Sequence, residues 1–180
     1  MQYLIRLSLD NTPLWRLIAL EGKADLSHSA KLMALSFNYP KATFRLQNKD
    51  TKIELGEDGA LCPQGSLSLE SLNLQAQDSF IFKVTLKTQE GEEIELSHTC
   101  QVLKAEERLY CLIPSTLVGA HKLADDGREL TIPNINAYLD ESETLDTLNL
   151  KECTDRMRAF GSVRAKLQGA DLKVAPFKVE

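Results

Sequence analysis

Hydrophobic residues occupy every second position in two runs at the start of the chain. The first run places apolar side chains at Tyr3, Ile5, Leu7 and Leu9. The run 14–20 has the same period. Between them, residues 10–13 read Asp-Asn-Thr-Pro, where side-chain bonds to the backbone and the fixed φ of proline favour a turn. The pattern predicts two strands joined as an antiparallel β-hairpin.

A helical pattern follows the predicted hairpin. Its apolar positions recur at helical intervals: Leu26, Ala30, Met33, Ala34 and Phe37. Asp25 is a favourable N-cap residue, and Pro40 cannot continue the helix. We therefore expect a helix over residues 25–37 whose apolar stripe packs on the hairpin.

The middle of the chain returns to strand periodicity. Alternating patterns predict strands at 42–46, 52–55, 80–86 and 94–100, and the Gln-Glu-Gly-Glu turn joins the last two as a hairpin. Leucines within 67–74 indicate a single helical turn. The predicted fold class is α+β: a mixed or antiparallel sheet of five or more strands, β-grasp-like at the start, with the first helix packed on one face.

The last third of the chain is predicted to be mainly helical. Pro133 favours the first turn of a short helix. A longer helix is predicted from Leu150, with an inner stripe at Cys153, Met157, Phe160, Val163 and Leu167. Gly169 is a suitable end for it, and residues 172–177 are compatible with an edge strand. We expect residues 1–140 to form one α+β domain and residues 141–180 a helical C-terminal part packed on it.

Composition places this chain of 180 residues among ordinary globular proteins, with 43% hydrophobic and 26% charged residues. Its net charge of -5 disfavours a general nucleic-acid binder, whose affinity rests on cations that neutralise phosphates. Positive charge nevertheless gathers on the last predicted helix, at Arg156, Arg158, Arg164 and Lys166. These residues are the candidate contacts if the chain associates with nucleic acid.

Metal and membrane sites are not indicated by the sequence. The four cysteines (Cys62, Cys100, Cys111 and Cys153) and the three histidines are far apart, whereas zinc sites use ligands in close-spaced pairs. The acidic residues between 125 and 146 lack EF-hand spacing and are typical of a solvated surface. We expect no metal, no cofactor, no signal peptide and no membrane span, and a cytoplasmic protein with reduced thiols.

The local motifs of the common enzyme classes are absent from the sequence: GxSxG, GxxxxGK[ST], HExxH and GxGxxG. Each of these motifs fixes a nucleophile, a phosphate cradle or a metal pair by local backbone geometry. We therefore assign no catalytic residue. An active site assembled from distant residues stays open as an alternative.

Trp15 and Arg16 are the most informative pair of residues for a binding site. Because successive strand residues point to opposite faces, one of the two faces inward and the other outward. In one interpretation Trp15 anchors the helix and Arg16 pairs with a carboxylate. In the other, Arg16 and the aromatic residue Tyr39 or Phe44 form a recognition patch, since arginine and aromatic side chains dominate binding hot spots.

A family resemblance rests on the hairpin and the first helix. The matching residues are Pro13, Leu14, Trp15, Arg16, Leu26 and Phe37. With the strand–strand–helix order, they resemble the plasmid pRiA4b ORF-3-like family. Asn38 and Tyr39 stand where that family usually has Gly and Trp, and the acidic aromatic motif of its later hairpin is absent here. The resemblance implies a link to plasmids and mobile elements and an α+β fold.

These observations favour a non-enzymatic binding or accessory module, with a protein as the expected partner. Two alternatives remain open at this point. One is a nucleic-acid-associated protein that uses the basic C-terminal helix, and the other is an enzyme with a site assembled from distant residues.

Overall fold

The structure is a computed structural model, and it describes residues 1–48, 51–57, 67–141 and 148–167. For residues 56–57 and 161–167 only the backbone is described. The predicted stop at Gly169, the predicted strand at 172–177 and Cys62 lie outside these ranges.

A single antiparallel sheet forms the centre of the described fold. It has seven strands in the order β4-β3-β5-β6-β1-β2-β7. The strands are β1 Gln2–Leu9, β2 Trp15–Glu21, β3 Ala42–Asn48, β4 Thr51–Glu57, β5 Ser79–Lys87, β6 Glu93–Glu106 and β7 Ser115–Ala120. Neighbouring strands pair antiparallel throughout, as in the β1–β2 hairpin, where Ile5 lies opposite Ile18.

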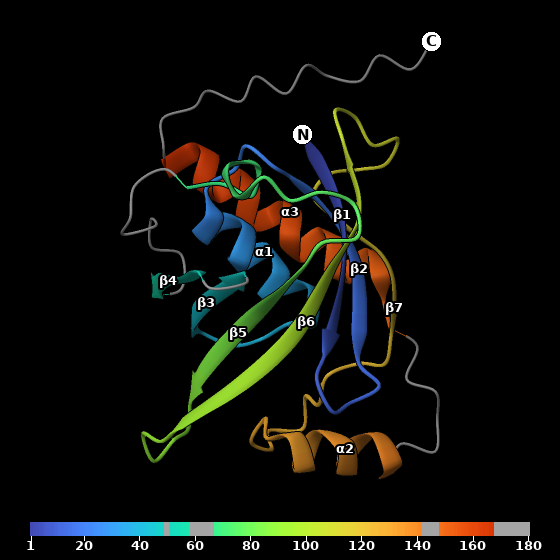
Figure 1. Ribbon diagram of the computed structural model, residues 1–180. Coiled ribbons are helices and arrows are strands. Elements are labelled where there is room, and N and C mark those ends of the chain that lie inside the picture. The colour runs from blue at the N-terminus through green and yellow to red at the C-terminus, as the bar shows by residue number, and fades with distance from the viewer. Residues whose placement is uncertain (49–50, 58–66, 142–147, 168–180) are drawn as a thin grey trace.

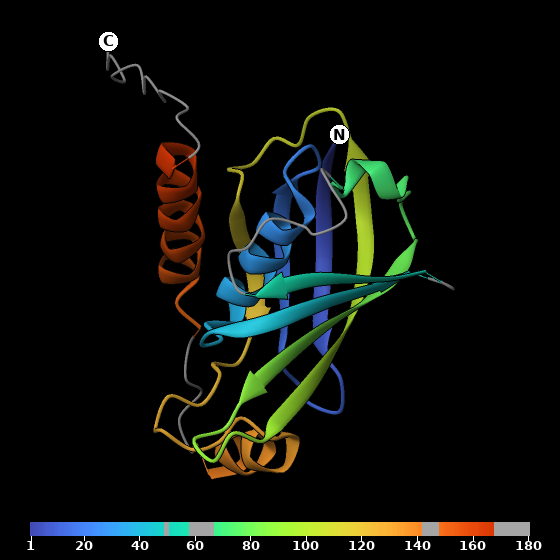
Figure 2. The same cartoon turned by 90° about the vertical axis from the view of Figure 1, so that its left-hand side faces the viewer.

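In the described part of the chain, three α-helices accompany the sheet: α1 Leu26–Phe37, α2 Ile132–Glu141 and α3 Leu150–Leu167. A short 3₁₀ turn also spans Glu70–Leu72. Figure 1 shows the sheet from the face opposite α3, and Figure 2 shows α1 against the sheet with α3 beyond it. α3 contacts both α1 and the edge strand β7. α2 lies at the end of the sheet, where Asn136 Nδ2 donates to the Asn11 carbonyl over 3.1 Å.

The helix-facing side of the sheet holds the hydrophobic core. On each long strand alternate residues are buried, as the period of two in the sequence requires. Leu7, Ile18 and Phe82 are among the fully buried side chains, and Met33 and Phe37 of α1 pack onto them in the same cluster. The core therefore lies between the sheet and α1.

The ends of α1 follow the predicted capping chemistry. The Asp25 carboxylate accepts from the backbone N–H groups of Ser27 and His28, which satisfies two of the first free donors of the helix. At the other end Asn38 adopts the left-handed conformation, with φ of 65°, and donates its backbone N–H to the Ala34 and Leu35 carbonyls. The helix ends at Phe37, three residues before Pro40.

The α+β fold class is confirmed, with an antiparallel sheet. The predicted hairpins, the first helix and both C-terminal helices are present. The strand β7 was missed, because Ser115, Thr116 and Gly119 give it no regular apolar alternation. Within the described residues, no helix is both long and apolar enough to cross a membrane.

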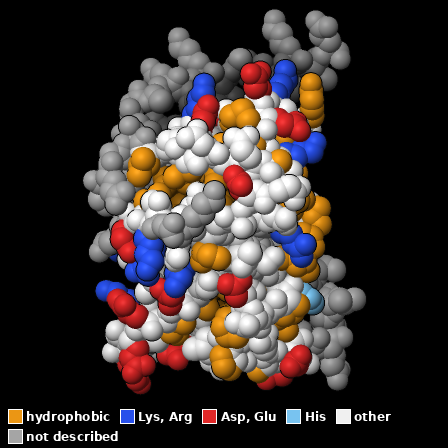
Figure 3. Space-filling view, in the orientation of Figure 1, with side chains coloured by type: hydrophobic (Ala, Val, Ile, Leu, Met, Phe, Trp, Pro, Cys, Tyr) orange, Lys and Arg blue, Asp and Glu red, His pale blue; other side chains and the backbone are white. Residues whose placement is uncertain are grey.

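The opposite face of the sheet carries mixed side chains. Figure 3 shows charged, polar and hydrophobic groups interspersed over this face, with hydrophobic groups along the margin beside β2 and β7. Val118 of β7 and the nearby Tyr110 and Leu112 are the exposed large hydrophobic residues among those described.

Candidate functional site

Arg16 occupies a core position on β2. Its side chain faces the helices and is only 1% exposed. Nε donates to the Ser36 carbonyl of α1 over 3.0 Å, and Nη1 donates to the Trp15 and Ala120 carbonyls over 2.8 Å and 2.9 Å. The guanidinium also lies over the Phe37 ring, 4.7 Å from its centroid. Arg16 thus ties together β2, β7 and the C-terminal end of α1.

The charge of Arg16 has no carboxylate partner among the described residues. Its third nitrogen, Nη2, likewise has no hydrogen-bond acceptor in the described part of the chain. Burial lowers the pKa of Arg16 to about 10, and the positive charge therefore persists at neutral pH. A buried positive charge that is balanced only by carbonyl dipoles is an unusual and costly arrangement.

Gly119 makes room for this arginine. It lies opposite Arg16 in the β2–β7 register. A Cβ atom at Gly119 would stand 3.0 Å from Arg16 Cδ, 2.8 Å from the Trp15 carbonyl oxygen and 2.6 Å from Leu148 Cδ2. Because real Cβ atoms do not approach backbone oxygen so closely, a larger residue here displaces either the arginine or the adjoining chain.

A cavity of about 180 Å³ adjoins the guanidinium of Arg16, and we call it the Arg16 cavity. It lies between the C-terminal end of α1, the segment after β7 and the first turns of α3. Its lining residues are Arg16, Phe37, Asn38, Lys122, Leu123, Leu148, Asn149, Glu152, Cys153 and Arg156. The volume is below the range of about 300–1,000 Å³ that is usual for drug-sized ligands, so the cavity suits a small group.

The other charges at the Arg16 cavity are paired. Arg156 Nη1 donates to Glu152 Oε1 over 2.7 Å, and Nη2 lies 3.3 Å from Cys153 Sγ. Lys122 forms an ion pair with Asp125. Arg16 is therefore the one cation of the lining that lacks a carboxylate within the described structure.

The start of α3 closes one side of the cavity. Asn149 Oδ1 accepts the backbone N–H of Glu152 over 3.1 Å, which caps the helix. One turn later Thr154 Oγ1 accepts the Thr116 N–H over 3.1 Å and donates to the Thr116 carbonyl over 3.3 Å. These bonds fix α3 along the otherwise open edge of β7, and they hold Asn149 and Cys153 at the cavity.

A second cavity, of about 610 Å³, shares Asn38 and Leu123 with the first. Its lining combines apolar residues with charges of both signs. The apolar residues are Tyr39, Pro40, Leu86, Ile94, Ala124 and Leu130, and the charged residues are Lys87, Asp125, Arg128 and Glu129.

A second buried polar cluster lies on the other side of Phe37. His98 of β6 is fully buried, and its Nδ1 lies 3.1 Å from the Phe82 carbonyl oxygen. Because a carbonyl only accepts, Nδ1 carries the proton, and Nε2 must accept the hydroxyl of Tyr39 over 2.9 Å. Burial lowers the pKa of His98 to about 4 and raises the pKa of Tyr39 far above its ordinary value. Both groups are neutral at pH 7.

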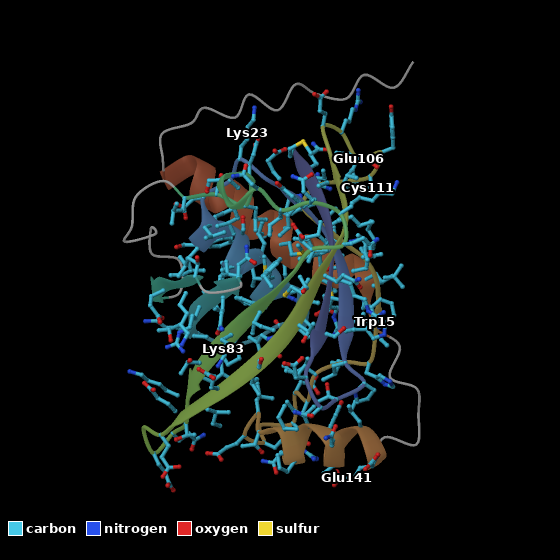
Figure 4. All side chains as sticks on the ribbon, in the orientation of Figure 1. Trp15, Lys23, Lys83, Glu106, Cys111 and Glu141 are labelled. Atoms are coloured by element: carbon cyan, nitrogen blue, oxygen red, sulfur yellow. The ribbon has the colours of Figure 1, made fainter. Side chains whose placement is uncertain are left out.

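The outward member of the Trp15–Arg16 pair is Trp15, so the expectation that it anchors the helix is wrong. Trp15, which is labelled in Figure 4, is half-buried on the face without α1. The Arg6 guanidinium lies over its ring, 4.8 Å from the centroid. Arg16 binds backbone carbonyls where a carboxylate was expected, because the C-terminal end of α1 brings free acceptors to it.

The predicted recognition patch of Arg16 with Tyr39 or Phe44 does not form at the surface. Tyr39 and Phe44 are both buried, Tyr39 against His98 and Phe44 against the Phe82 ring at 5.7 Å. Both side chains pack in the core, and Tyr39 also borders the second cavity.

The basic residues of α3 divide into two groups. Arg156 is bound to Glu152 as described, and Arg158 is exposed and has a partner. The side chains of Arg164 and Lys166 lie outside the described residues. Among the residues with described side chains, no cluster of three histidine, cysteine or acidic side chains has the arrangement of a metal site.

Sequence reasoning missed Gly119, Lys122, Asn149 and Cys153 as neighbours of Arg16. Their separation along the chain hides the cluster, since Arg16 and Ala120 are 104 positions apart. The one local signal was Asn149, an N-cap residue directly before the apolar stripe of the last helix.

No protein-family model, no curated protein and no solved structure was found to match this chain. The resemblance to the plasmid pRiA4b ORF-3-like family stays a prediction from the residues of the hairpin and first helix.

Proposed function

We propose that this chain is a non-enzymatic binding module that holds a small anionic group in the Arg16 cavity. The observation that carries the proposal is the buried guanidinium, which adjoins a cavity and has neither a carboxylate partner nor an acceptor for Nη2 among the described residues. The guanidinium is already held in place by three hydrogen bonds in the folded chain. An entering anion therefore gains a charge-assisted hydrogen bond without having to order the arginine side chain.

A binding role has more support than a catalytic one. The groups near Phe37 with the largest pKa shifts, Tyr39 and His98, bond to each other and to a carbonyl inside the core. A general acid or base must reach the proton that it transfers. His98 lines neither cavity, and the hydroxyl of Tyr39, a residue that borders the second cavity, is bonded to His98 inside the core.

A nucleic-acid role through α3 has less support. Lys151 pairs with Asp155 over 2.6 Å and Arg156 pairs with Glu152 over 2.7 Å, so neighbouring carboxylates neutralise the first turns of the helix. Phosphate contacts would have to compete with these pairs.

Thermal unfolding in different sodium salts tests the proposal. Acetate, phosphate and sulfate are each compared with chloride at equal ionic strength. We expect at least one of these anions to raise the melting temperature saturably, since a ligand of the native state stabilises it by RT ln(1 + [L]/Kd). Equal curves in all salts would contradict the proposal.

Two charge-reversal variants provide the matched comparison. Lys122→Glu places a carboxylate at the lining of the Arg16 cavity. Lys104→Glu makes the same change at an exposed residue of β6 that lines neither cavity. Anion stabilisation is expected to fall in Lys122→Glu and to persist in Lys104→Glu. Equal loss in both would indicate a general ionic effect.

A further inference from the structure

We infer that the anionic group is the free C-terminal carboxylate of a partner polypeptide, whose last residues run from the Arg16 cavity past Asn38 and Leu123 into the second cavity. This inference rests on the proposed function and adds the class of the ligand. It follows from the charge of the Arg16 cavity, from the sizes of the two cavities and from the chemistry of the residues that line the second cavity.

The charge of the lining favours an anion with a single negative charge. Of the three cations at the cavity, Lys122 and Arg156 are paired and Arg16 is not. A carboxylate carries one negative charge and balances Arg16 alone. A phosphate monoester carries about 1.5 to 2 negative charges, and its second charge would face the Glu152 carboxylate in the same lining.

Hydrogen-bond donors for a carboxylate are present at the cavity. Arg16 Nη2 retains its N–H groups, as described above. Asn149 uses Oδ1 to cap α3, so its amide nitrogen is left to donate, and the Asn149 side chain lines the cavity. One guanidinium and one amide are sufficient for the two oxygens of a carboxylate, a group that proteins also capture at the ends of peptide ligands.

The second cavity provides the path for the rest of the ligand. The two cavities share Asn38 and Leu123 and are therefore adjacent. In the proposed complex, the ligand has its charged end beside Arg16 and passes these two residues. At about 180 Å³ the first cavity holds little more than a terminal group, and at about 610 Å³ the second accommodates further residues.

The walls of the second cavity suit a peptide better than an alkyl chain. Apolar side chains such as Leu86 and Ile94 alternate there with Lys87, Asp125 and Arg128. Asp125 is paired with Lys122, and Arg128 is paired with Asp126 and Glu141. A hydrocarbon tail would cover these polar groups without offering them any hydrogen bond. A peptide brings amide donors and acceptors along with apolar side chains, and so it satisfies both kinds of surface.

Paired peptide libraries test the inference on the full chain. N-acetylated hexapeptides with randomised final residues are synthesised once as free acids and once as C-terminal amides. Retained sequences are identified on the immobilised protein, and their affinities are measured by fluorescence polarisation. We expect free-acid peptides to bind and their amides to bind at least about tenfold more weakly, the size expected for one charge-assisted hydrogen bond.

The variants locate the carboxylate. Lys122→Glu, at a half-exposed position of the lining, is expected to weaken binding of the free acids and to leave the weak binding of the amides unchanged. Lys104→Glu is expected to change neither. The inference is overturned if free acids and amides bind equally, or if Lys104→Glu weakens binding as much as Lys122→Glu does.

Small anions separate this inference from the proposed function. If acetate or propionate stabilises the protein and no free-acid peptide binds, the ligand is a small free acid, and only the inference fails. If phosphate stabilises it and carboxylates do not, the class of the anion is wrong and the proposed function stands. If no anion stabilises the protein and no peptide binds to it, both the proposed function and the inference fail.

Discussion

His98 and Arg16 are polar residues buried in the same core, and they differ in how completely their hydrogen-bonding groups are satisfied. Both contact Phe37, His98 with its ring centroid at 5.0 Å and Arg16 with its guanidinium at 4.7 Å. Each ring nitrogen of His98 has one partner, in the Phe82 carbonyl and the Tyr39 hydroxyl. Arg16 retains an unpaired Nη2 and an unbalanced charge within the described chain, and it adjoins a cavity.

The difference separates a structural role from a binding role. Buried polar groups in native proteins are almost always satisfied, and a fully bonded pair such as Tyr39–His98 fixes the packing of the core. A buried cation that is bonded on two of its three nitrogens is held rigidly and still has an N–H group for a ligand. Four predictions test this contrast.

Arg16→Met is expected to have the largest effect on stability. The variant removes the donors to the Ser36, Trp15 and Ala120 carbonyls and leaves these acceptors facing an apolar side chain. The free energy of unfolding, measured by urea denaturation, is expected to fall by about 3–5 kcal/mol, because each buried carbonyl left without its donor costs about 1–3 kcal/mol and the removal of a buried charge offsets part of this loss. Arg6→Met, on the opposite face, loses only its stacking on Trp15 and is expected to lose less than about 1 kcal/mol. Similar losses of unfolding free energy in the two variants would show that the buried Arg16 stabilises the fold no more than the exposed Arg6 does.

Low pH is expected to destabilise the protein through protonation of the buried His98. Burial lowers the pKa of His98 to about 4 from an ordinary 6.5, so between these pH values the unfolded chain binds more protons than the folded one. Stability is therefore lost as the pH falls from 6.5 towards 4, by roughly 3 kcal/mol from this group. Urea denaturation across this range should show a steeper loss in the wild type than in His98→Gln. Parallel curves would contradict the buried neutral histidine.

Tyr39→Phe tests the hydrogen bond between the Tyr39 hydroxyl and His98 Nε2. The variant leaves His98 Nε2 without a donor at an unchanged ring volume, and we expect a loss of about 2 kcal/mol in the free energy of unfolding. Tyr110→Phe is the control, because Tyr110 is 94% exposed. If the Tyr39 variant is as stable as this control, the tyrosine–histidine bond contributes nothing to stability.

Gly119→Ala is expected to have the smallest effect on stability and a clear effect on the site. The added methyl group meets the Trp15 carbonyl oxygen and Arg16 Cδ, and a loss of about 1–2 kcal/mol follows from such overpacking. Displacement of Arg16 should also reduce the stabilisation by acetate. Val118→Ala, at an exposed residue of the same strand, is expected to preserve that stabilisation. An unchanged acetate effect in Gly119→Ala would show that the position of Arg16 is not critical.

The sequence is sufficient to predict those parts of the fold that have a regular period. The hairpin from Tyr3 to Leu20 and the helix from Leu26 to Phe37 follow from periods of two and 3.6 together with an N-cap aspartate. β7 could not be predicted in this way, because its inward positions hold Thr116, which bonds Met157 of α3, and Gly119, which accommodates Arg16.

The Arg16 site was predicted only in part. Strand geometry required that Trp15 and Arg16 face opposite sides, and general burial preferences place tryptophan inside and arginine outside. The structure has the reverse. Carbonyl acceptors from α1 and β7 compensate the buried guanidinium, and these elements become neighbours only when the chain has folded. No local pattern contains that information.

The most direct test of the binding site is the Nε–H resonance of Arg16 in an NMR titration with sodium acetate at constant ionic strength. The Arg16 side chain is held by three hydrogen bonds, so its Nε–H is expected to give a resolved signal. We predict a saturable shift of this signal in the wild type and in Lys104→Glu, and a weaker response in Lys122→Glu. The contradicting result is an Arg16 signal that does not shift even at the acetate concentration at which the rise in melting temperature saturates. That result would rule out an anion site in this cavity.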